Sequence, residues 1–179
     1  MTYYAFIKDN QIDGAGQVEC LNPEIQNIEI TEEQFNNIQD YIYSNGEIVL
    51  NPELDAIKLQ QVKDLKIEEN DRIRDEALLQ GVLYNSVLFD SDTDQKVNLL
   101  ATVETMPDDK TVVWFGKDNQ PLTCTKEDLF NIGGLITQLH SFCWNKNAQI
   151  KQAINNAVTI AEVEAIDIDY TESEGENGI

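Results

Sequence analysis

The sequence predicts an α+β protein: a small β-rich N-terminal unit, a long connecting helix and a helical C-terminal domain with β-hairpins. Residues 1–52 hold short apolar runs separated by turn-forming residues, which is typical of small sheets. Residues 54–80 contain neither Gly nor Pro, which favours one uninterrupted helix. Beyond them, strand patterns alternate with a strong helical repeat. We therefore expect four segments, at 1–52, 53–81, 82–166 and, as an acidic flexible tail, 167–179.

Short strands and one helix are expected in the N-terminal unit. The expected strands are residues 2–8, a weak second strand before Gly14 and Gly16, residues 27–30 and residues 47–50. Thr31 and Gln34 have the spacing of a capping box, which predicts that a helix begins there. The apolar positions that this helix is expected to bury are Phe35, Ile38 and Ile42. Asn45-Gly46 is predicted to end the helix, because both residues tolerate a left-handed conformation.

The predicted long helix carries two apolar stretches with a polar stretch between them. Its apolar residues are Leu54, Ile57, Val62 and Leu65, then Ile73, Ala77 and Leu78. Residues 66–72 are mostly polar, with Ile67 as the only apolar residue. This pattern favours an exposed connecting helix stabilised by Glu/Lys and Asp/Arg pairs, which ends at Gly81. The alternative is a helix that packs against copies of itself, although its heptads are broken.

The segment after Gly81 is expected to contain two hairpins and two further helices. Residues 83–89 predict a strand pair that turns at Asn85-Ser86, and a capping box at 92–95 opens a helix. A second hairpin is expected from 111–115 and 122–124. The predicted core residues are Phe89, Leu100, Trp114, Ile132, Ile136 and Leu139.

Thr125 and Asp128 form another predicted cap, and the strongest helical stripe of the chain follows it. Its apolar positions are Leu129, Ile132, Ile136, Leu139, Cys143, Ile150 and Ala157. Thr159 and Glu162 cap a last short helix that runs through Val163 and Ile166. Gly133-Gly134 lies inside the stripe, where it predicts a close approach of another helix.

Charge and composition limit the kinds of partner. The 12 Lys and Arg residues stand against 33 Asp and Glu residues, for a formal net charge of −21. This balance argues against nucleic acid and against an anionic membrane surface, since both require a basic footprint. No apolar run approaches the length of a membrane span. An acidic surface is compatible with a basic protein partner.

No residue pattern supports catalysis, a cofactor or a metal. His140 is the only histidine and lies three positions before Cys143, so the two could share a helix face, yet nothing supplies a third orienting group. Asp90, Asp92 and Asp94 alternate as in a calcium loop, but Gln95 stands where such a loop needs Gly. The three cysteines, Cys20 included, show no metal spacing, and we expect them to be reduced. We assign no catalytic, cofactor-binding or metal residues and expect no enzyme.

The central segment resembles a family. The patterns are G-V-x-Y-N-x-V-x-F-D-S-D at 81–92, W-F-G-x-D-N at 114–119, L-T-x-T-x-x-D-L at 122–129, His140 and V-T-x-x-E-V-x-A-I at 158–166. They resemble a domain of unknown function found in tailed bacteriophages and prophages, commonly near tail-fibre genes. The resemblance covers roughly residues 72–166. The first 52 residues are similar to short N-terminal modules of phage tail accessory proteins.

The resemblance implies a bacteriophage tail component, expected to be a tail-fibre or fibre-attachment structural subunit. Its expected partners are phage tail or baseplate proteins and further copies of itself. Self-association is expected through the helix at 54–80, with a trimer as the usual symmetry of fibres. The alternative is a tail-fibre assembly chaperone that is absent from the mature virion. The N-terminus lacks the features of a signal peptide, so we expect the protein in the host cytoplasm during assembly and then in the virion tail.

Overall fold

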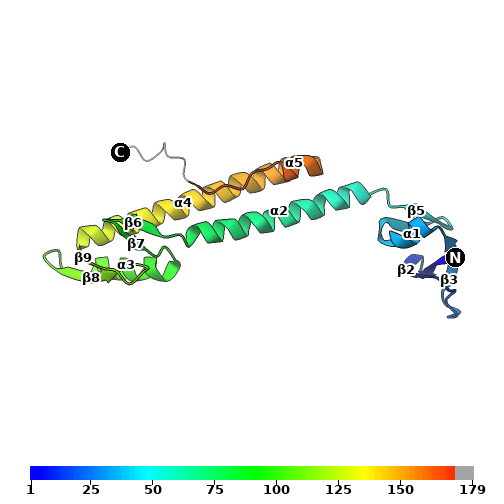
Figure 1. Ribbon diagram of the computed structural model, residues 1–179, viewed down its shortest axis with the longest axis horizontal. Helices are drawn as coiled ribbons and strands as arrows, with labels where there is room; N and C mark the ends of the chain where they lie inside the picture. Colours follow the sequence, from blue (N-terminus) through cyan, green and yellow to red (C-terminus); the bar gives the residue numbers. More distant parts are fainter. Residues whose placement is uncertain (172–179) are drawn as a thin grey trace. The chain divides into compact units, whose positions relative to one another are not determined.

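A computed structural model describes residues 1–171 and confirms the α+β class. The chain divides into two compact units, Met1–Gln60 and Gln61–Ile179 (Figure 1). The first contains β1 (Tyr3–Lys8), β2 (Gln11–Gly16), β3 (Gln26–Ile30), α1 (Glu32–Asn36), the short 3-10 helix η1 (Ile38–Asp40), β4 (Tyr41–Ser44), β5 (Glu47–Leu50) and the start of α2 (Leu54–Leu78). The second contains the rest of α2, β6 (Val82–Tyr84), β7 (Val87–Phe89), α3 (Thr93–Thr105), β8 (Thr111–Phe115), β9 (Pro121–Thr125), α4 (Lys126–Asn156) and α5 (Ile160–Glu164).

The first unit contains two small antiparallel sheets. Strand β1 lies between β2 and β3, and β4 pairs with β5. Ala5, Ile7 and Ile30 are its buried apolar residues, and Phe35 and Ile48 pack against them. The capping box is confirmed. The Thr31 hydroxyl accepts from the backbone amide of Gln34, and the Gln34 side-chain oxygen accepts from the backbone amide of Thr31.

The helix predicted to run from this cap to Asn45-Gly46 is wrong beyond Asn36. Ile42 lies in β4 opposite Val49, and Asn45-Gly46 is the turn of the β4–β5 hairpin. The φ angles of Asn45 and Gly46 are 52° and 93°, as a two-residue hairpin turn requires at both central positions. The Asn-Gly pair therefore reverses a strand here and does not end a helix.

In the second unit, α4 runs antiparallel to α2 along the part of α2 that follows Gln60. Contacts between the two helices descend along α4 as they ascend along α2. They are Lys63 to the Asn155 carbonyl, Asn70 to the Asn147 carbonyl, and Arg74 over the Trp144 ring. Figure 1 shows the two helices side by side. The polar stretch 66–72, expected to be exposed, is wrong at Asn70, whose side chain is fully buried against α4.

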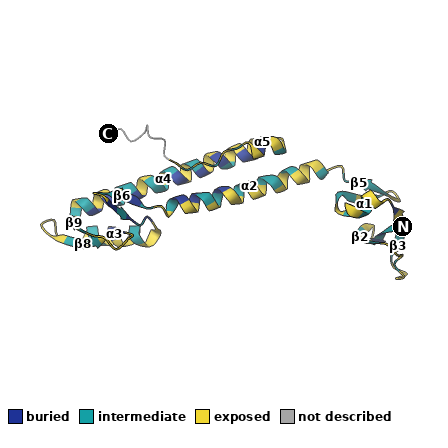
Figure 2. Cartoon of the chain, viewed as in Figure 1, coloured by how far each residue is buried: buried dark blue, intermediate teal, exposed yellow. Residues whose placement is uncertain are grey.

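The main apolar core joins both hairpins, α3 and the first half of α4. Its buried residues are Val82, Val87, Phe89, Leu99, Cys124, Leu129, Ile132 and Ile136. Figure 2 shows buried and exposed residues alternating along α4, as expected for an amphipathic helix. Leu139 and Trp114, predicted in the core, are partly buried and pack against it.

Leu100 was predicted in this core, and that prediction is wrong. Its side chain is 62% exposed, whereas that of Leu99 is 2% exposed. Helix α3 begins at the predicted position, where the Asp92 carboxylate accepts from the Gln95 amide as a simple N-cap rather than as the predicted capping box. The helix then turns Leu99 towards α4 and leaves Val97 and Leu100 outside. In α3, Leu99 rather than Leu100 therefore lies in the core, and Val103 packs against it.

The last described residues return towards the helix pair. After α5, which has the predicted Thr159–Glu162 capping box, the Tyr170 hydroxyl donates to the Asn70 side chain. Part of the acidic tail predicted from residue 167 is therefore held against α2, and its remainder, 172–179, lies outside the described residues. Within residues 1–171, no helix has both the length and the apolar character needed to cross a bilayer.

Candidate functional site

A polar cluster joins the middle of α2 to α4 and to the segment after α5. The Asn70 side chain is its centre: its amide donates to the Asn147 carbonyl at 3.3 Å, and its oxygen accepts from the Tyr170 hydroxyl at 2.8 Å. The neighbouring Asp71 carboxylate accepts from the Asn147 side chain and from Lys151, each at 2.9 Å. Because a buried amide without partners is costly, these contacts hold the helices in one register.

Arg74 adds a cation one turn further along α2. Its guanidinium donates to Asp71 at 2.9 Å and to Asp75 at 2.7 Å, and it lies 4.3 Å from the centre of the Trp144 ring. The side chain is only 11% exposed. The planar guanidinium both stacks on the indole and forms ion pairs, which an ammonium does less well.

The groups around Asp71 stabilise its ionised carboxylate. Burial raises the pKa of Asp71, but the hydrogen bonds from Lys151 and Asn147 and the charges of Lys151 and Arg74 outweigh burial. The pKa of Asp71 therefore lies below its ordinary value. Burial also raises the pKa of the Tyr170 phenol, which keeps this group neutral and able to donate. The ionised Asp71 carboxylate thus links α2 to α4 through Asn147 and Lys151.

A second polar contact fixes the end of α2. The Ser91 hydroxyl donates to the Leu78 carbonyl, and the Ser91 carbonyl lies 2.6 Å from Nε2 of His140. A carbonyl only accepts, so Nε2 of His140 carries a proton in this contact. Lys117 donates to the Leu79 carbonyl at 2.6 Å. Side chains distant in sequence thus satisfy carbonyls that the helix end leaves without intrahelical donors.

The His140–Cys143 pair considered from the sequence lies on α4, with its two members in different surroundings. Nε2 of His140 is engaged by Ser91, and the side chain of Cys143 has no exposed surface. Cys124 is also fully buried, and burial raises the pKa of its thiol. A buried thiol that no substrate reaches is a core residue in this geometry.

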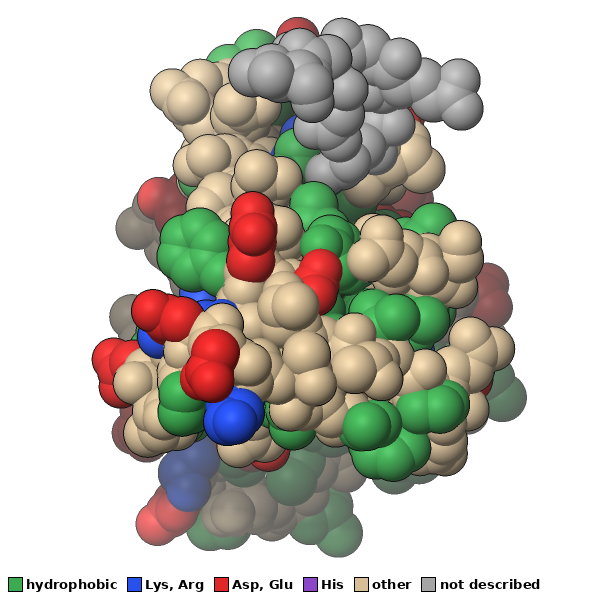
Figure 3. Space-filling model, turned by 90° about the vertical axis from the view of Figure 1, so that its left-hand side faces the viewer, with side chains coloured by type: hydrophobic (Ala, Val, Ile, Leu, Met, Phe, Trp, Pro, Cys, Tyr) green, Lys and Arg blue, Asp and Glu red, His purple; other side chains and the backbone are tan. Residues whose placement is uncertain are grey.

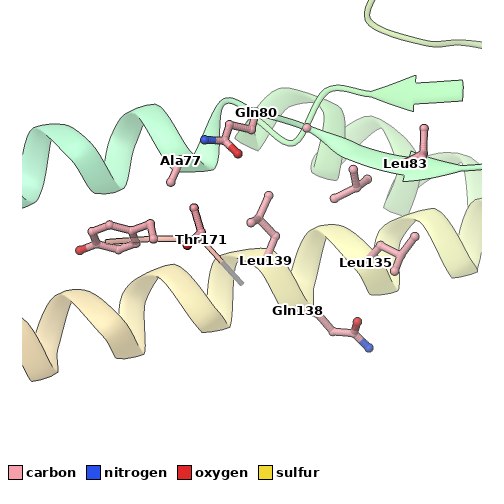
Figure 4. A pocket seen from close by; sticks show the side chains of 10 residues that line it. Ala77, Gln80, Leu83, Leu135, Gln138, Leu139 and Thr171 are labelled. Atoms are coloured by element: carbon pink, nitrogen blue, oxygen red, sulfur yellow. The ribbon is translucent and has the colours of Figure 1, made fainter. Parts of the chain in front are cut away.

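A hollow of about 430 Å³ lies beside the polar cluster, between the end of α2, β6, α4 and the segment after α5. Figure 4 shows Ala77 and Leu139 pointing towards each other across it, with Thr171 between the helices and Gln138 directed away. Its lining side chains are apolar groups, amides and hydroxyls, and none is a carboxylate, a histidine or a cation. The hollow thus supplies no acid–base pair.

The alternating aspartates lie at the start of α3, with Asp94 inside its first turn. Asp92 is the N-cap, and Asp90 lies 3.9 Å from Lys117. Among residues 1–171, no cluster of three or more His, Cys, Asp or Glu side chains has an arrangement that could hold a metal ion.

Gly133-Gly134 was predicted to admit a neighbouring helix, and within the described part of the chain that prediction is wrong. A Cβ added to either glycine would meet no atom within 4 Å. The glycines instead line an open groove of about 440 Å³ between α3 and α4. Sequence analysis missed this groove and the polar cluster, since neither has a local signature.

One family model matches most of the second unit. It is described as "Domain of unknown function (DUF4376)", and it covers residues 61–172, more than half of the chain. The chain belongs to the DUF4376 family. The match includes the whole of residues 72–166, for which the sequence showed a family resemblance. It begins at residue 61, where the second compact unit also begins. No curated protein and no solved structure gives a significant match to the chain.

Proposed function

We propose that this DUF4376 protein is a bacteriophage tail component, a tail-fibre or fibre-attachment structural subunit that acts through protein–protein contacts. The observation that carries the proposal is the polar cluster around Asn70 and Asp71. This cluster fixes the position of the long helix α4 against α2, and a subunit that attaches a fibre needs such fixed geometry. The 31 residues of α4 extend about 46 Å at 1.5 Å per residue. The motif resemblance at residues 81–166 supports the phage setting.

The proposal includes partners, location and chemistry. The partners are phage tail or baseplate proteins and further copies of this chain, with a trimer as the symmetry that fibres favour. The net charge of −21 suits a basic docking surface. The protein acts in the host cytoplasm during assembly and then in the virion tail. The proposed role is structural and involves no catalysis, because no residue pattern in the sequence supplies a nucleophile together with an orienting group.

The second candidate is a tail-fibre assembly chaperone that leaves after its client has folded. Exposed apolar side chains on the second unit favour it, since a chaperone covers apolar client surface. Phe130 is 70% exposed and Trp144 is 53% exposed. The acidic surface would also shield a basic client.

Quantitative mass spectrometry of gradient-purified phage particles tests the proposal. We expect the protein at a fixed ratio to the tail proteins, with host cytoplasmic proteins as the contamination control. Detection only in infected lysate, bound to unassembled fibre protein, would establish the chaperone instead. Absence from both particles and fibre complexes would contradict both candidates.

A further inference from the structure

The groove between α3 and α4 is lined mainly by apolar side chains, and the space next to Gly133 and Gly134 is unfilled. Leu99, Leu100 and Val103 form the α3 wall, and Phe130, Gly133 and Gly134 contribute from α4. Leu100 and Phe130 are 62% and 70% exposed. Apolar side chains are exposed over this end of the second unit (Figure 3). Large exposed apolar surfaces with aromatic residues are typical of binding sites.

The walls of the groove lack charge, although the chain is strongly acidic. Residues 97–103 of α3 and 129–145 of α4 contain no Asp, Glu, Lys or Arg. At the margins, Lys96 lines the groove, and Lys126, Asp108 and Glu127 line the adjoining hollow. These margins hold two cations and two anions, so their charge does not favour a basic partner over an acidic one. Two copies with a net charge of −21 each repel one another, and they meet most favourably where both surfaces lack charge.

We propose that this groove binds a second copy of the same chain, with Phe130 of one copy seated over Gly133-Gly134 of the other. Phe130 and the glycines are one helical turn apart on the same face of α4. One surface therefore carries both the exposed Phe130 ring and the unfilled part of the groove next to Gly133-Gly134. A surface with both features is complementary to itself, as a two-fold contact between identical chains requires. The inference does not depend on the phage role.

Sedimentation of the isolated full-length protein, over a wide range of protein concentration, tests this contact. We expect reversible self-association that strengthens as NaCl is raised, because salt screens the repulsion between acidic chains. Phe130→Lys should raise the dissociation constant about a hundredfold, since a central aromatic residue is lost and a charge enters. Gly134→Leu should weaken association to a similar degree, because the leucine side chain fills the groove. Its melting temperature should be unchanged or raised, because Leu favours the helix more than Gly does.

Gln149→Leu is the matched control, because Gln149 is an exposed α4 residue away from the groove. Its association should equal that of the wild type. Circular dichroism verifies the fold of each variant, and Leu100→Lys, on the opposite wall, replaces any variant that fails to fold. A protein that stays monomeric throughout, or one whose association is insensitive to the groove variants, would overturn the proposal. Association that weakens with NaCl would overturn it in favour of a contact between opposite charges.

Discussion

The Asn70 side chain of α2 donates to the backbone carbonyl of Asn147 on α4, and its own oxygen accepts from the Tyr170 hydroxyl. One fully buried amide thus connects α2, α4 and the segment after α5. Removing it leaves the partly buried Tyr170 hydroxyl without this acceptor and takes a polar contact away from the buried surface between α2 and α4, so the fold loses stability.

Asn70→Ala should therefore lower the free energy of unfolding by about 2 kcal/mol. Tyr170→Phe, which removes a single hydroxyl, should cost about 1 kcal/mol. Urea titration of both variants and of the double variant gives their coupling energy. Strictly additive losses would show that the Asn70–Tyr170 bond contributes nothing in solution.

Arg74→Lys should destabilise the protein by about 1–2 kcal/mol, because Lys loses the forked ion pair with Asp75 and the stacking on Trp144. The tryptophan fluorescence of the folded protein should also change. Arg72→Lys is the matched control on the same helix: its ion pair with Glu76 joins side chains that are 60% and 62% exposed, so the loss should stay below about 0.5 kcal/mol. Equal losses for the two variants would contradict the buried role of Arg74.

Leu99 and Leu100 should respond very differently to truncation. Leu99→Ala leaves a cavity in the core and should cost about 3 kcal/mol, measured by chemical denaturation. Leu100→Ala removes a largely exposed side chain and should cost less than about 1 kcal/mol in the monomer. The opposite order would show that α3 packs through the face predicted from the sequence.

Acid should destabilise the second unit through Asp71 and Asp128. Hydrogen bonds from the hydroxyl and the backbone amide of Thr125 hold the pKa of Asp128 below its ordinary value, and the pKa of Asp71 is also lowered. A carboxyl group with a lowered pKa stabilises the fold above its unfolded pKa of about 3.9, and this contribution is lost as the pH falls through the folded pKa.

Urea midpoints measured from neutral to acid pH should therefore fall below about pH 4. Lys151→Met removes a cation from Asp71 and should move the loss of stability to higher pH. Asp71→Asn should be less stable near neutral pH and should show a shallower acid dependence. A wild-type acid profile in both variants would exclude Asp71 as a contributor.

Thiol labelling of the native protein should modify Cys20 first. Cys20 is partly exposed, whereas Cys124 and Cys143 are fully buried. In a Cys20→Ser variant, we expect slow labelling at neutral pH that becomes fast on unfolding. Fast native labelling of Cys143 would indicate an accessible thiolate and would revive the alternative of a hydrolase that uses Cys143 and His140.

The sequence alone determined most helix starts and tight turns, because these depend on residues close together in the chain. The Thr31, Thr125 and Thr159 boxes are confirmed, since each joins a hydroxyl to an amide three residues later. The Asn85-Ser86 turn is confirmed by the positive φ of both residues. The division into four segments remains a prediction.

The tertiary structure alone decided which face of each helix is buried and where polar groups find partners. Leu99 and Leu100 are equally apolar, and only the position of α4 distinguishes them. Asn45-Gly46 suits a helix end or a hairpin turn, and pairing of β4 with β5 selects the turn. Asn70 lies in a polar stretch that suits solvent, yet its partners on α4 and at Tyr170 are 77 and 100 positions away. Contacts over such separations depend on chain packing, which local patterns do not encode.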